Sequence, residues 1–206
     1  MFSEAGFGTP PATGFPGEVG GRLRAPSTWK PIEQATMSYG HGLSVNLVQL
    51  ARAYTAFASD GEVKPVALFK TAGAVAGKPI MAPATARAVR HMLELATLPG
   101  GTAPQAQVAG YRVAGKTGTA RKIEGREYTH KYVASFVGLA PVSNPRLVLA
   151  VMIDEPTGGQ YYGGSVAGPV FSSVMGAALR MLGVPTDAPV DNVVLPPPGS
   201  EVEEET

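Results

Sequence analysis

Three stretches with the composition of β-strands follow one another in the second half of the chain. They cover residues 111–122, 131–139 and 147–153. The segment "EGRE" separates the first two and "PVSNPR" separates the last two, and both contain residues typical of tight turns. A parallel pair would need a crossover of about a dozen residues, so strands linked this closely pair antiparallel. The chain is therefore restricted to folds that contain an antiparallel meander of about three strands.

Helical patterns lie on both sides of this meander. Residues 46–59 repeat apolar side chains at helical spacing, with Asn46 as the N-cap and Gln49 completing a capping box. A second helix is expected over 83–97, where a proline suits the first turn. A last helix starts near Pro169 and turns these residues inward: Val170, Phe171, Val174, Met175, Ala178 and Leu182. The pattern predicts an α/β protein of the α+β type, with an antiparallel sheet packed against helices.

The remaining segments are expected to carry little regular structure. Residues 1–45 are rich in glycine and proline and predict tight turns packed on another part of the chain. Residues 63–70 predict a short strand, which Pro65 places at a sheet edge. Residues 183–206 are rich in proline and acids, and we expect a disordered tail there. The organisation is thus one folded unit over 1–182 followed by this tail.

Composition excludes several kinds of site. The sequence contains no cysteine, which rules out disulfides, thiol catalysis and cysteine metal ligands. His41, His91 and His130 lie far apart without ligand spacing, so we expect neither a metal nor a cofactor. No stretch approaches the roughly 18–20 apolar residues of a membrane span, and the first residues do not resemble a signal peptide. We therefore expect no membrane anchor in this sequence.

The charge distribution favours an anionic ligand. The net charge is +1, but six of the 16 acidic residues follow the last basic residue, Arg180. The preceding body carries 10 acidic against 17 basic residues, a net charge of +7. It has no basic cluster with interleaved aromatic residues, so nucleic acid is not expected as a partner. A negatively charged substrate is the simpler match.

The segment "VAGKTGTARK" places Lys116, Thr117, Gly118 and Thr119 in a row on the first expected strand. The run is either a polar strand end with Gly118 at a bulge, or a strand that binds a ligand. Beside a cleft, glycine lets a ligand backbone approach, and an extended peptide can pair with the free N–H and C=O groups. Lysine and threonine hydroxyls bind a carboxylate, and a backbone N–H near Thr119 would suit an oxyanion hole.

Several segments together resemble one family. The stretch "GYRVAGKTGTARK" resembles the third motif of the penicillin-binding proteins, the serine D,D-transpeptidases that cross-link peptidoglycan. Five further segments look like class B members, above all the division-type FtsI-like proteins: "GFGTPPATGFPGE", "MSYGHGLSVNLVQLARAYTAFASDG", "LPGGTA", "VASFVGLAP" and "YYGGSVAGPVF". The resemblance covers roughly residues 5–182. It marks residues 1–182 as a partial penicillin-binding transpeptidase domain, the C-terminal part.

The resemblance implies a role for each residue of the motif. Lys116, Thr117 and Thr119 would contact the terminal carboxylate of a D-Ala-D-Ala stem peptide or of a β-lactam. Gly118 would give the ligand clearance. The family thereby selects the ligand-binding interpretation of this strand.

Further expectations follow from the same resemblance. Tyr161 and Tyr162 would form an aromatic wall at the rim of the cleft, the alternative being that they pack on the sheet edge. The implied partners are peptidoglycan stem peptides, β-lactams, the N-terminal part of the domain and division-complex proteins. The implied location is the periplasmic face of the bacterial inner membrane.

The family needs two further motifs, a Ser-x-x-Lys that supplies nucleophile and base and a Ser-x-Asn that relays protons. Both patterns occur, as Ser27 to Lys30 and as Ser44 to Asn46. Pro31 directly follows and would interrupt a helix that starts near Ser27. The segment also lacks a long apolar stripe, and the 17 positions from Ser27 to Ser44 are too few for the family. We interpret Ser27 as a solvated loop serine and Asn46 as a helix cap.

Three hypotheses remain open. In the first, the chain is part of a D,D-transpeptidase whose nucleophile lies upstream, and it is inactive alone and aggregation-prone because its apolar surfaces lack partners. In the second, it is a non-catalytic module that binds peptidoglycan peptides or β-lactams. In the third, it is a complete small serine acyltransferase that uses Ser27 and Lys30. A phosphate-binding P-loop fits poorly, since "GKTGT" has neither the required glycine spacing nor a following helix.

Overall fold

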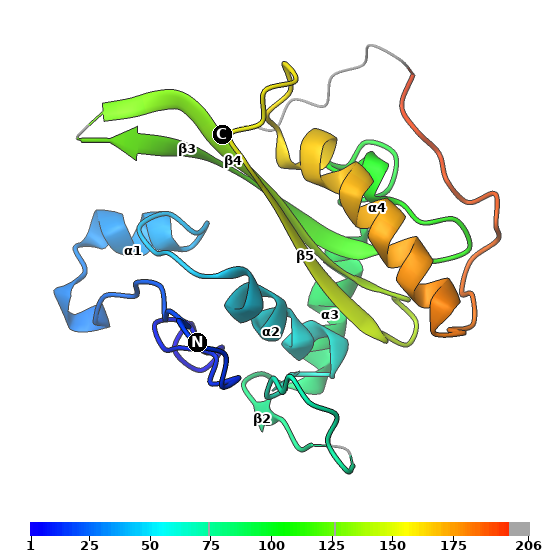
Figure 1. Cartoon of the computed structure of the whole chain (residues 1–206), viewed down its shortest axis with the longest axis horizontal. Coiled ribbons are helices and arrows are strands. Elements are labelled where there is room, and N and C mark those ends of the chain that lie inside the picture. Colours follow the sequence, from blue (N-terminus) through cyan, green and yellow to red (C-terminus); the bar gives the residue numbers. More distant parts are fainter. Residues whose placement is uncertain (74, 126, 198–206) are drawn as a thin grey trace.

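The computed structural model describes residues 1–73, 75–125 and 127–197 (Figure 1). Arg126 of the expected turn "EGRE" lies outside these residues. In the described part, the elements follow in the order η1 (Pro26–Thr28), α1 (Pro31–Met37), α2 (Leu47–Ala58), β1 (Glu62–Val63), β2 (Lys78–Pro79), α3 (Pro83–Glu94), η2 (Pro104–Ala106), β3 (Ala114–Glu124), β4 (Glu127–Ala140), β5 (Leu147–Asp154) and α4 (Gly163–Met181).

The main sheet has the strand order β3-β4-β5, and each neighbouring pair is antiparallel. The predicted meander is therefore confirmed. Both β3 and β4 run further toward their common turn than expected, and their hairpin projects beyond the helices in Figure 1. A register irregularity lies between Arg121 and Ile123 in this projecting part. β3 and β5 are the edge strands of this sheet, and among the described residues no further strand pairs with the outer side of either one.

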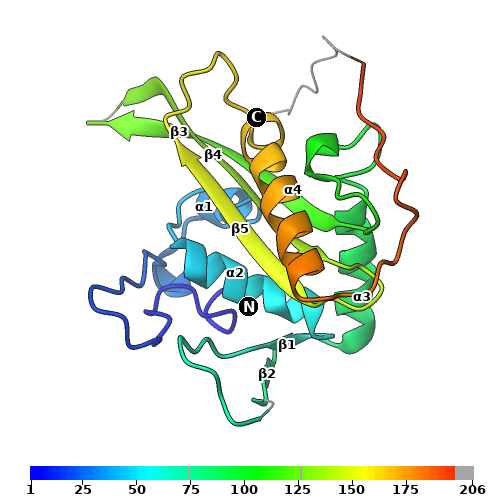
Figure 2. The same cartoon turned by 45° about the vertical axis from the view of Figure 1, so that its right-hand side comes forward.

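Helices pack on both faces of the sheet (Figures 1 and 2). On one face, Phe171 of α4 meets Phe136 of β4 edge to face, with ring centroids 4.8 Å apart. Leu147 and Leu149 of β5 pack into the same cluster. Val148, which lies between them, instead packs with the cluster that includes side chains of α2 and α3. Because successive strand residues point to opposite faces, α4 lies opposite α2 and α3.

Helix α4 begins at Gly163, six residues before the expected start, and this corrects the sequence prediction. Pro169 lies inside the helix and is exposed, where its missing N–H removes one backbone hydrogen bond. Fewer side chains of α4 face the core than the sequence predicted. Phe171, Met175 and Leu179 are buried at intervals of four residues, while the expected core residues Val170, Val174 and Leu182 are 40%, 46% and 63% exposed.

The strand expected over 63–70 is wrong in all but its first residue. The short strand β1 ends at Val63 and pairs antiparallel with β2. Pro65 follows after one residue and has no N–H for a sheet ladder. Beyond it, Leu68 and Phe69 are 56% and 86% exposed, so this apolar stretch has no sheet to cover.

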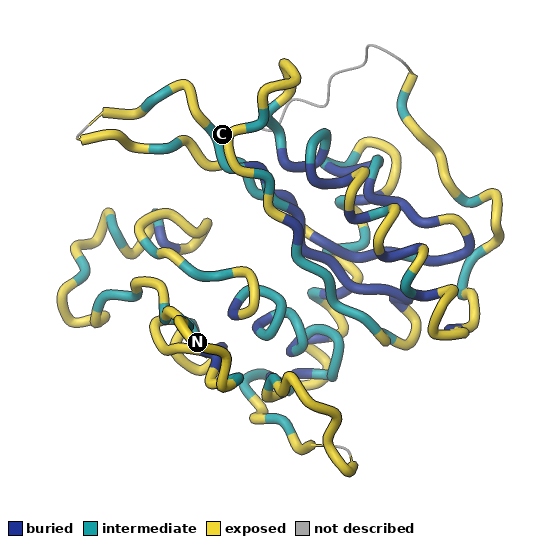
Figure 3. The backbone as a smooth tube through the Cα atoms, viewed as in Figure 1, coloured by how far each residue is buried: buried dark blue, intermediate teal, exposed yellow. Residues whose placement is uncertain are grey.

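The glycine- and proline-rich segment before α2 packs on that helix, as predicted. Gln49 is only 1% exposed, and its Nε2 donates to the carbonyls of Gly6, Thr9 and Gly20 at 2.8–3.2 Å. Asn46 caps α2, since its Oδ1 accepts the Gln49 N–H at 2.8 Å. The predicted capping box is confirmed. Figure 3 shows that burial is nevertheless concentrated in the sheet and α4, whereas the N-terminal segment is largely exposed.

Disorder was expected from residue 183 onward, yet residues 184–194 are held against the loop before β3. The Asp187 carboxylate accepts the backbone N–H groups of Arg112 at 2.8 Å and Ser143 at 3.1 Å. The Asn192 side chain accepts the Gly110 N–H and donates to the carbonyls of Val108 and Tyr111. Composition did not indicate these contacts, because they depend on the loop that the segment meets. Residues 198–206 of the expected tail lie outside the described residues.

Candidate functional site

The Lys-Thr-Gly-Thr run lies on β3, at the free edge of the main sheet. Strand alternation turns Thr117 inward, where it is 9% exposed, and leaves Lys116 exposed. The Lys116 side chain nevertheless folds back, and its Nζ donates to the Thr117 Oγ1 at 3.3 Å. An ammonium group and a threonine hydroxyl thus meet at a strand edge that is free to pair with an extended ligand.

The other threonine of the run connects β3 to the start of α4. Thr119 Oγ1 accepts the backbone N–H of Gly163, the first residue of α4, at 2.9 Å. A Cβ on Gly163 would lie 2.3 Å from the Ser135 carbonyl oxygen and 2.7 Å from that of Gly118, so only glycine permits this approach. The N-terminus of a 19-residue helix therefore lies beside the motif. Its partial positive charge adds to that of Lys116.

The structure explains the glycine at position 118 by a close contact and not by the bulge considered above. It pairs with Ser135 in regular register, and the irregularity of this ladder lies further along, after Arg121. A Cβ on Gly118 would lie 2.6 Å from Ser135 Oγ, which itself donates to the Gly118 carbonyl at 3.2 Å. The glycine makes room for this hydroxyl on the neighbouring strand.

Aromatic rings line the approach to α4. The rings of Tyr161 and Tyr162 have centroids 4.5 Å apart, and Tyr132 of β4 stacks on Tyr161 at 4.1 Å with an interplanar angle of 17°. The Arg121 guanidinium lies 5.9 Å from the ring centroids of Tyr128 and Tyr132. Sequence reasoning identified only the tyrosine pair. Tyr132 could have been found from the hairpin, because it is the cross-strand partner of Arg121, five positions after Lys116.

A group of charges ties the hairpin to the end of β5. Lys122 Nζ lies 2.7 Å from a Glu155 oxygen and 3.0 Å from an Asp154 oxygen. These hydrogen bonds, first that to Glu155 and then that to Asp154, raise the pKa of Lys122 above its ordinary value. Because both carboxylates are exposed and Lys122 is only partly buried, the group contributes little stability.

The two patterns that imitate the missing catalytic motifs do not form a site. Ser27 is exposed in the short helix η1, and exposed Lys30 precedes Pro31, the first residue of α1. In the described part of the chain, no hydrogen bond joins Ser27 to Lys30. Asn46 is occupied as the cap of α2, and its Nδ2 donates to the Val19 carbonyl at 2.7 Å.

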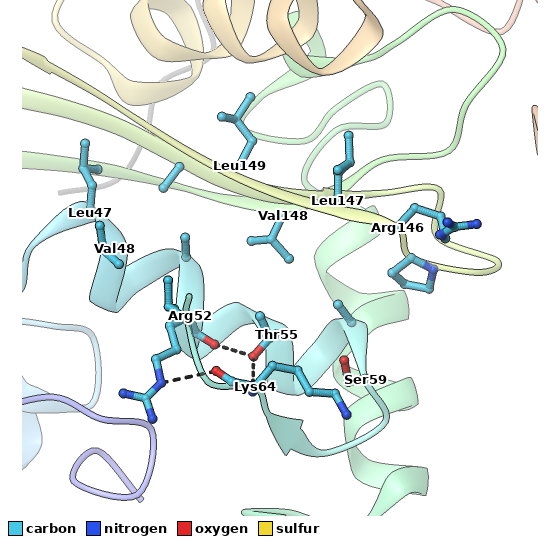
Figure 4. A pocket seen from close by; sticks show the side chains of 15 residues that line it. Leu47, Val48, Arg52, Thr55, Ser59, Lys64, Arg146, Leu147, Val148 and Leu149 are labelled. Atoms are coloured by element: carbon cyan, nitrogen blue, oxygen red, sulfur yellow. Dashed lines mark hydrogen bonds between the residues drawn. The ribbon is translucent and has the colours of Figure 1, made fainter. Parts of the chain in front are cut away.

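A groove of about 570 Å³ lies between α2 and the edge strand β5 (Figure 4). Val148 points from β5 toward α2, whereas Leu147 and Leu149 point away from it. Leu47 and Val48 of α2, also on the lining, are 38% and 42% exposed. The groove is thus an apolar surface next to an open strand edge.

The described residues contain neither a cluster of metal-ligand side chains nor a membrane-spanning helix. Among them, no group of three or more His, Asp or Glu side chains could hold a metal ion. None of the described helices is both long and apolar enough to cross a membrane.

The mixed α/β fold, with its Lys-Thr-Gly edge strand beside a helix N-terminus, is the class of fold that the resemblance in the sequence implies. Comparison with known proteins specifies that class. The family model of the penicillin-binding protein transpeptidase domain matches residues 1–176. The chain therefore belongs to the penicillin-binding protein transpeptidase family.

Individual relatives agree with this assignment. The transpeptidase domain of penicillin-binding protein 3 from Burkholderia pseudomallei has 57% identity and a TM-score of 0.86, over 92% of this chain and 58% of that one. The probable peptidoglycan D,D-transpeptidase PenA of Neisseria meningitidis is 50% identical over 92% of this chain and 33% of its own length. The peptidoglycan D,D-transpeptidase FtsI of Escherichia coli is 42% identical over 91% of this chain. The chain spans about a third of the length of these curated relatives.

Proposed function

We propose that this chain provides the carboxylate-binding strand of a peptidoglycan D,D-transpeptidase. Its ligand is the terminal carboxylate of a D-Ala-D-Ala stem peptide, or the equivalent group of a β-lactam. The observation that carries the proposal is the meeting of Lys116 with Thr117 at a free strand edge, beside the N-terminus of α4. Charge-assisted hydrogen bonds from an ammonium and hydroxyls are the strong contacts for a carboxylate.

The strand orients the peptide for acyl transfer. The free edge of β3 pairs with the peptide backbone, and Tyr161 and Tyr162 form the adjacent wall. A serine hydroxyl attacks the penultimate D-Ala carbonyl, the bond to the terminal D-Ala breaks, and an acyl-enzyme forms. The amine of a second stem peptide then takes the acyl group and releases the serine.

The nucleophile in this proposal comes from a part of the domain outside this sequence. Ser27 is the one serine in a Ser-x-x-Lys pattern. It is exposed and lies in η1, whereas Lys30 precedes the first residue of the next helix, α1. The apolar groove and the open β5 edge offer a surface on which that other part packs. The chain alone is accordingly inactive, and it acts with the rest of the transpeptidase domain at the periplasmic face of the inner membrane, among division-complex proteins.

Labelling of the purified chain with fluorescent penicillin tests this assignment. We expect folded protein to show no covalent band, because the nucleophile is absent. A band that disappears in Ser27→Ala would instead establish a complete small acyltransferase. Ser44→Ala serves as a control for nonspecific loss of labelling.

The alternative is a non-catalytic module, and the same carboxylate contacts favour it. Titration with a D-Ala-D-Ala peptide, followed by NMR, measures its binding directly. Binding that is lost in Lys116→Ala and kept in Lys70→Ala, a lysine of the exposed loop after β1, supports the ligand site. If the chain binds the peptide yet never restores labelling when supplied with the rest of a relative's domain, the binding module is the better description.

A further inference from the structure

The segment that follows α4 turns back toward the end of the molecule that carries the Lys-Thr-Gly strand. Its contacts move step by step along the loop before β3, from the Arg112 N–H at Asp187 to the Gln107 side chain at Val194. Gln107 accepts the Val194 N–H and donates to the Val194 carbonyl, both at 2.9 Å. Figures 1 and 2 show the same course, toward the end of the molecule at which α4 begins. The chain after Val194 therefore continues from the neighbourhood of the candidate site.

The distance that remains is short enough for the rest of the chain to cover. Gln107 is five positions from Thr102, and five residues span at most about 18 Å when extended. The Thr102 Oγ1 in turn lies 3.2 Å from the Thr117 Oγ1 of the motif. From Val194 to Glu203, nine residues cover about 30 Å when extended. The last residues of the sequence can thus reach the Lys-Thr-Gly strand.

Those last residues carry the charge that the site attracts. Residues 198–206, the acidic end, lie outside the described residues, and their sequence contains no basic residue and four acidic ones: Glu201, Glu203, Glu204 and Glu205. In the described part of the chain, the Lys116 ammonium hydrogen-bonds only to oxygens of Thr117, at 3.3 and 3.5 Å, and meets no carboxylate. The N-terminus of α4 adds partial positive charge beside it. The acidic end and the site are therefore complementary in charge.

We propose that the glutamates of the acidic end bind at Lys116 and compete there with the carboxylate of the substrate. The inference rests on the proposed function and adds an occupant from the same chain. The outer edge of β3 pairs with no other described strand and can hydrogen-bond to the backbone of this segment. Because the connection to the site is so short, the effective concentration of the glutamates is on the order of millimolar. Weak contacts between glutamates and an exposed lysine then give partial occupancy, which salt reduces.

The first experiment compares the full chain with a full-length variant that carries four substitutions: Glu201→Gln, Glu203→Gln, Glu204→Gln and Glu205→Gln. A stem-peptide analogue that ends in D-Ala-D-Ala is titrated into each and followed by NMR at low salt. If the acidic end occupies between half and nine-tenths of the sites, the apparent Kd of the peptide falls about two- to tenfold in the variant. The difference should vanish at high salt. Asp191→Asn, at an exposed acid of the held segment, is the control and should leave the Kd unchanged.

A spin label locates the acidic end directly. The sequence has no cysteine, so Thr206→Cys provides a single labelling site. We expect the label to broaden the amide signals of residues 116–119 and to leave those of residues 68–70, in the loop after β1, unchanged. Broadening spread evenly over the molecule would overturn the proposal. So would broadening seen only between a spin-labelled chain and a second, isotope-labelled copy.

The two proposals fail in distinguishable ways. If the peptide binds through Lys116 with the same Kd in both chains, and the label broadens no signal of β3, the acidic end is not an occupant and the proposed function stands. If the label broadens residues 116–119 but neither chain binds the peptide in a way that Lys116→Ala abolishes, the proposed function fails, and competition with a substrate fails with it.

Discussion

The smallest scale at which the site can be tested is a single glycine. In Gly163→Ala, the new methyl would collide with two carbonyl oxygens at 2.3 and 2.7 Å, those of Ser135 and Gly118. The start of α4 must then move away from β3 and lose the bond to Thr119. We expect a loss of about 1–3 kcal/mol in the free energy of unfolding, the usual effect of overpacking, measured by urea denaturation.

Gly158→Ala provides the matched control for that measurement. A Cβ there would meet nothing within 4 Å, and the residue belongs to the loop between β5 and α4 that leads to Gly163. Its stability should stay within about 1 kcal/mol of the original, since alanine also restricts the unfolded chain. A comparable loss in both variants would show that the loop, and not the contact of Gly163, determines stability.

At the residue scale, the sequence identified side chains that share one segment and missed those that come from others. Lys116 to Thr119 form a continuous run with a recognisable pattern, and the edge position of their strand was part of the expectation. Thr102 and Tyr132 reach the same place from a loop and from the neighbouring strand. Their position depends on tertiary packing and strand register, which no local pattern encodes.

At the scale of elements, replacing the proline inside α4 should raise the stability of the protein, whereas Gly163→Ala lowers it. Pro169 is exposed and cannot donate to the Ser165 carbonyl, one turn earlier. Pro169→Ala restores that donor and removes the ring clash. We expect the free energy of unfolding to rise by about 1–2 kcal/mol, less than the full ~3 kcal/mol helix penalty because the unfolded chain also becomes more flexible.

Pro83→Ala is the corresponding control, because Pro83 occupies the first turn of α3, where no N–H is needed. It should leave stability unchanged or lower it by a few tenths of a kcal/mol. If Pro169→Ala brings no gain, the helix at this point makes up for the missing bond in another way.

A second test at this scale concerns helix α2, through its N-cap residue Asn46. Asn46→Ala removes the acceptor for the Gln49 N–H and should cost about 1 kcal/mol in a denaturation experiment. Asn46→Asp keeps this acceptor and loses only the Nδ2 donor to Val19, so its loss should be smaller. Equal losses in the two variants would show that Asn46 stabilises the protein mainly through its hydrogen bond to the Val19 carbonyl in the N-terminal segment.

Element boundaries were predicted well where periodicity and caps agreed, and poorly where glycine or proline gave the signal. Both the meander and α2 followed from alternation and from a capping box. The start of α4 was misplaced because proline is common in a first turn, whereas Gly163 and Gly164 are poor helix formers. Their presence is explained by the close approach to β3 and to Thr102, which only the folded structure reveals.

At the scale of the whole molecule, the segment after α4 should contribute measurable stability. A chain that ends at Gly183 would lose the hydrogen bonds of Asp187 and Asn192 and the one from the Tyr111 hydroxyl to the Val184 carbonyl. At about 0.5–1 kcal/mol for each of these six bonds, we expect a loss of about 3–6 kcal/mol and a lower Tm. A chain that ends at Leu195 retains these contacts and should match the full sequence. Equal stability of the two shortened chains would contradict this role.

The composition of residues 184–194 did not indicate their contacts, and this has a physical reason. Proline-rich, polar sequence cannot form a core of its own, yet it can satisfy buried backbone groups of another element. The N–H and C=O groups around Gly110 require such partners, and Asn192 supplies them. Contacts of this kind depend on two distant segments and leave no periodic pattern in either.

The open edge of β5, with its apolar groove, also makes this chain suitable as half of a split reporter. On the proposed function, a second polypeptide that packs there would carry the serine that acts with the Lys-Thr-Gly strand. Covalent labelling by fluorescent penicillin would then require both halves, and its intensity would follow the product of their concentrations. If the two halves were fused to two other proteins, an interaction between those proteins would produce a lasting covalent fluorescent label.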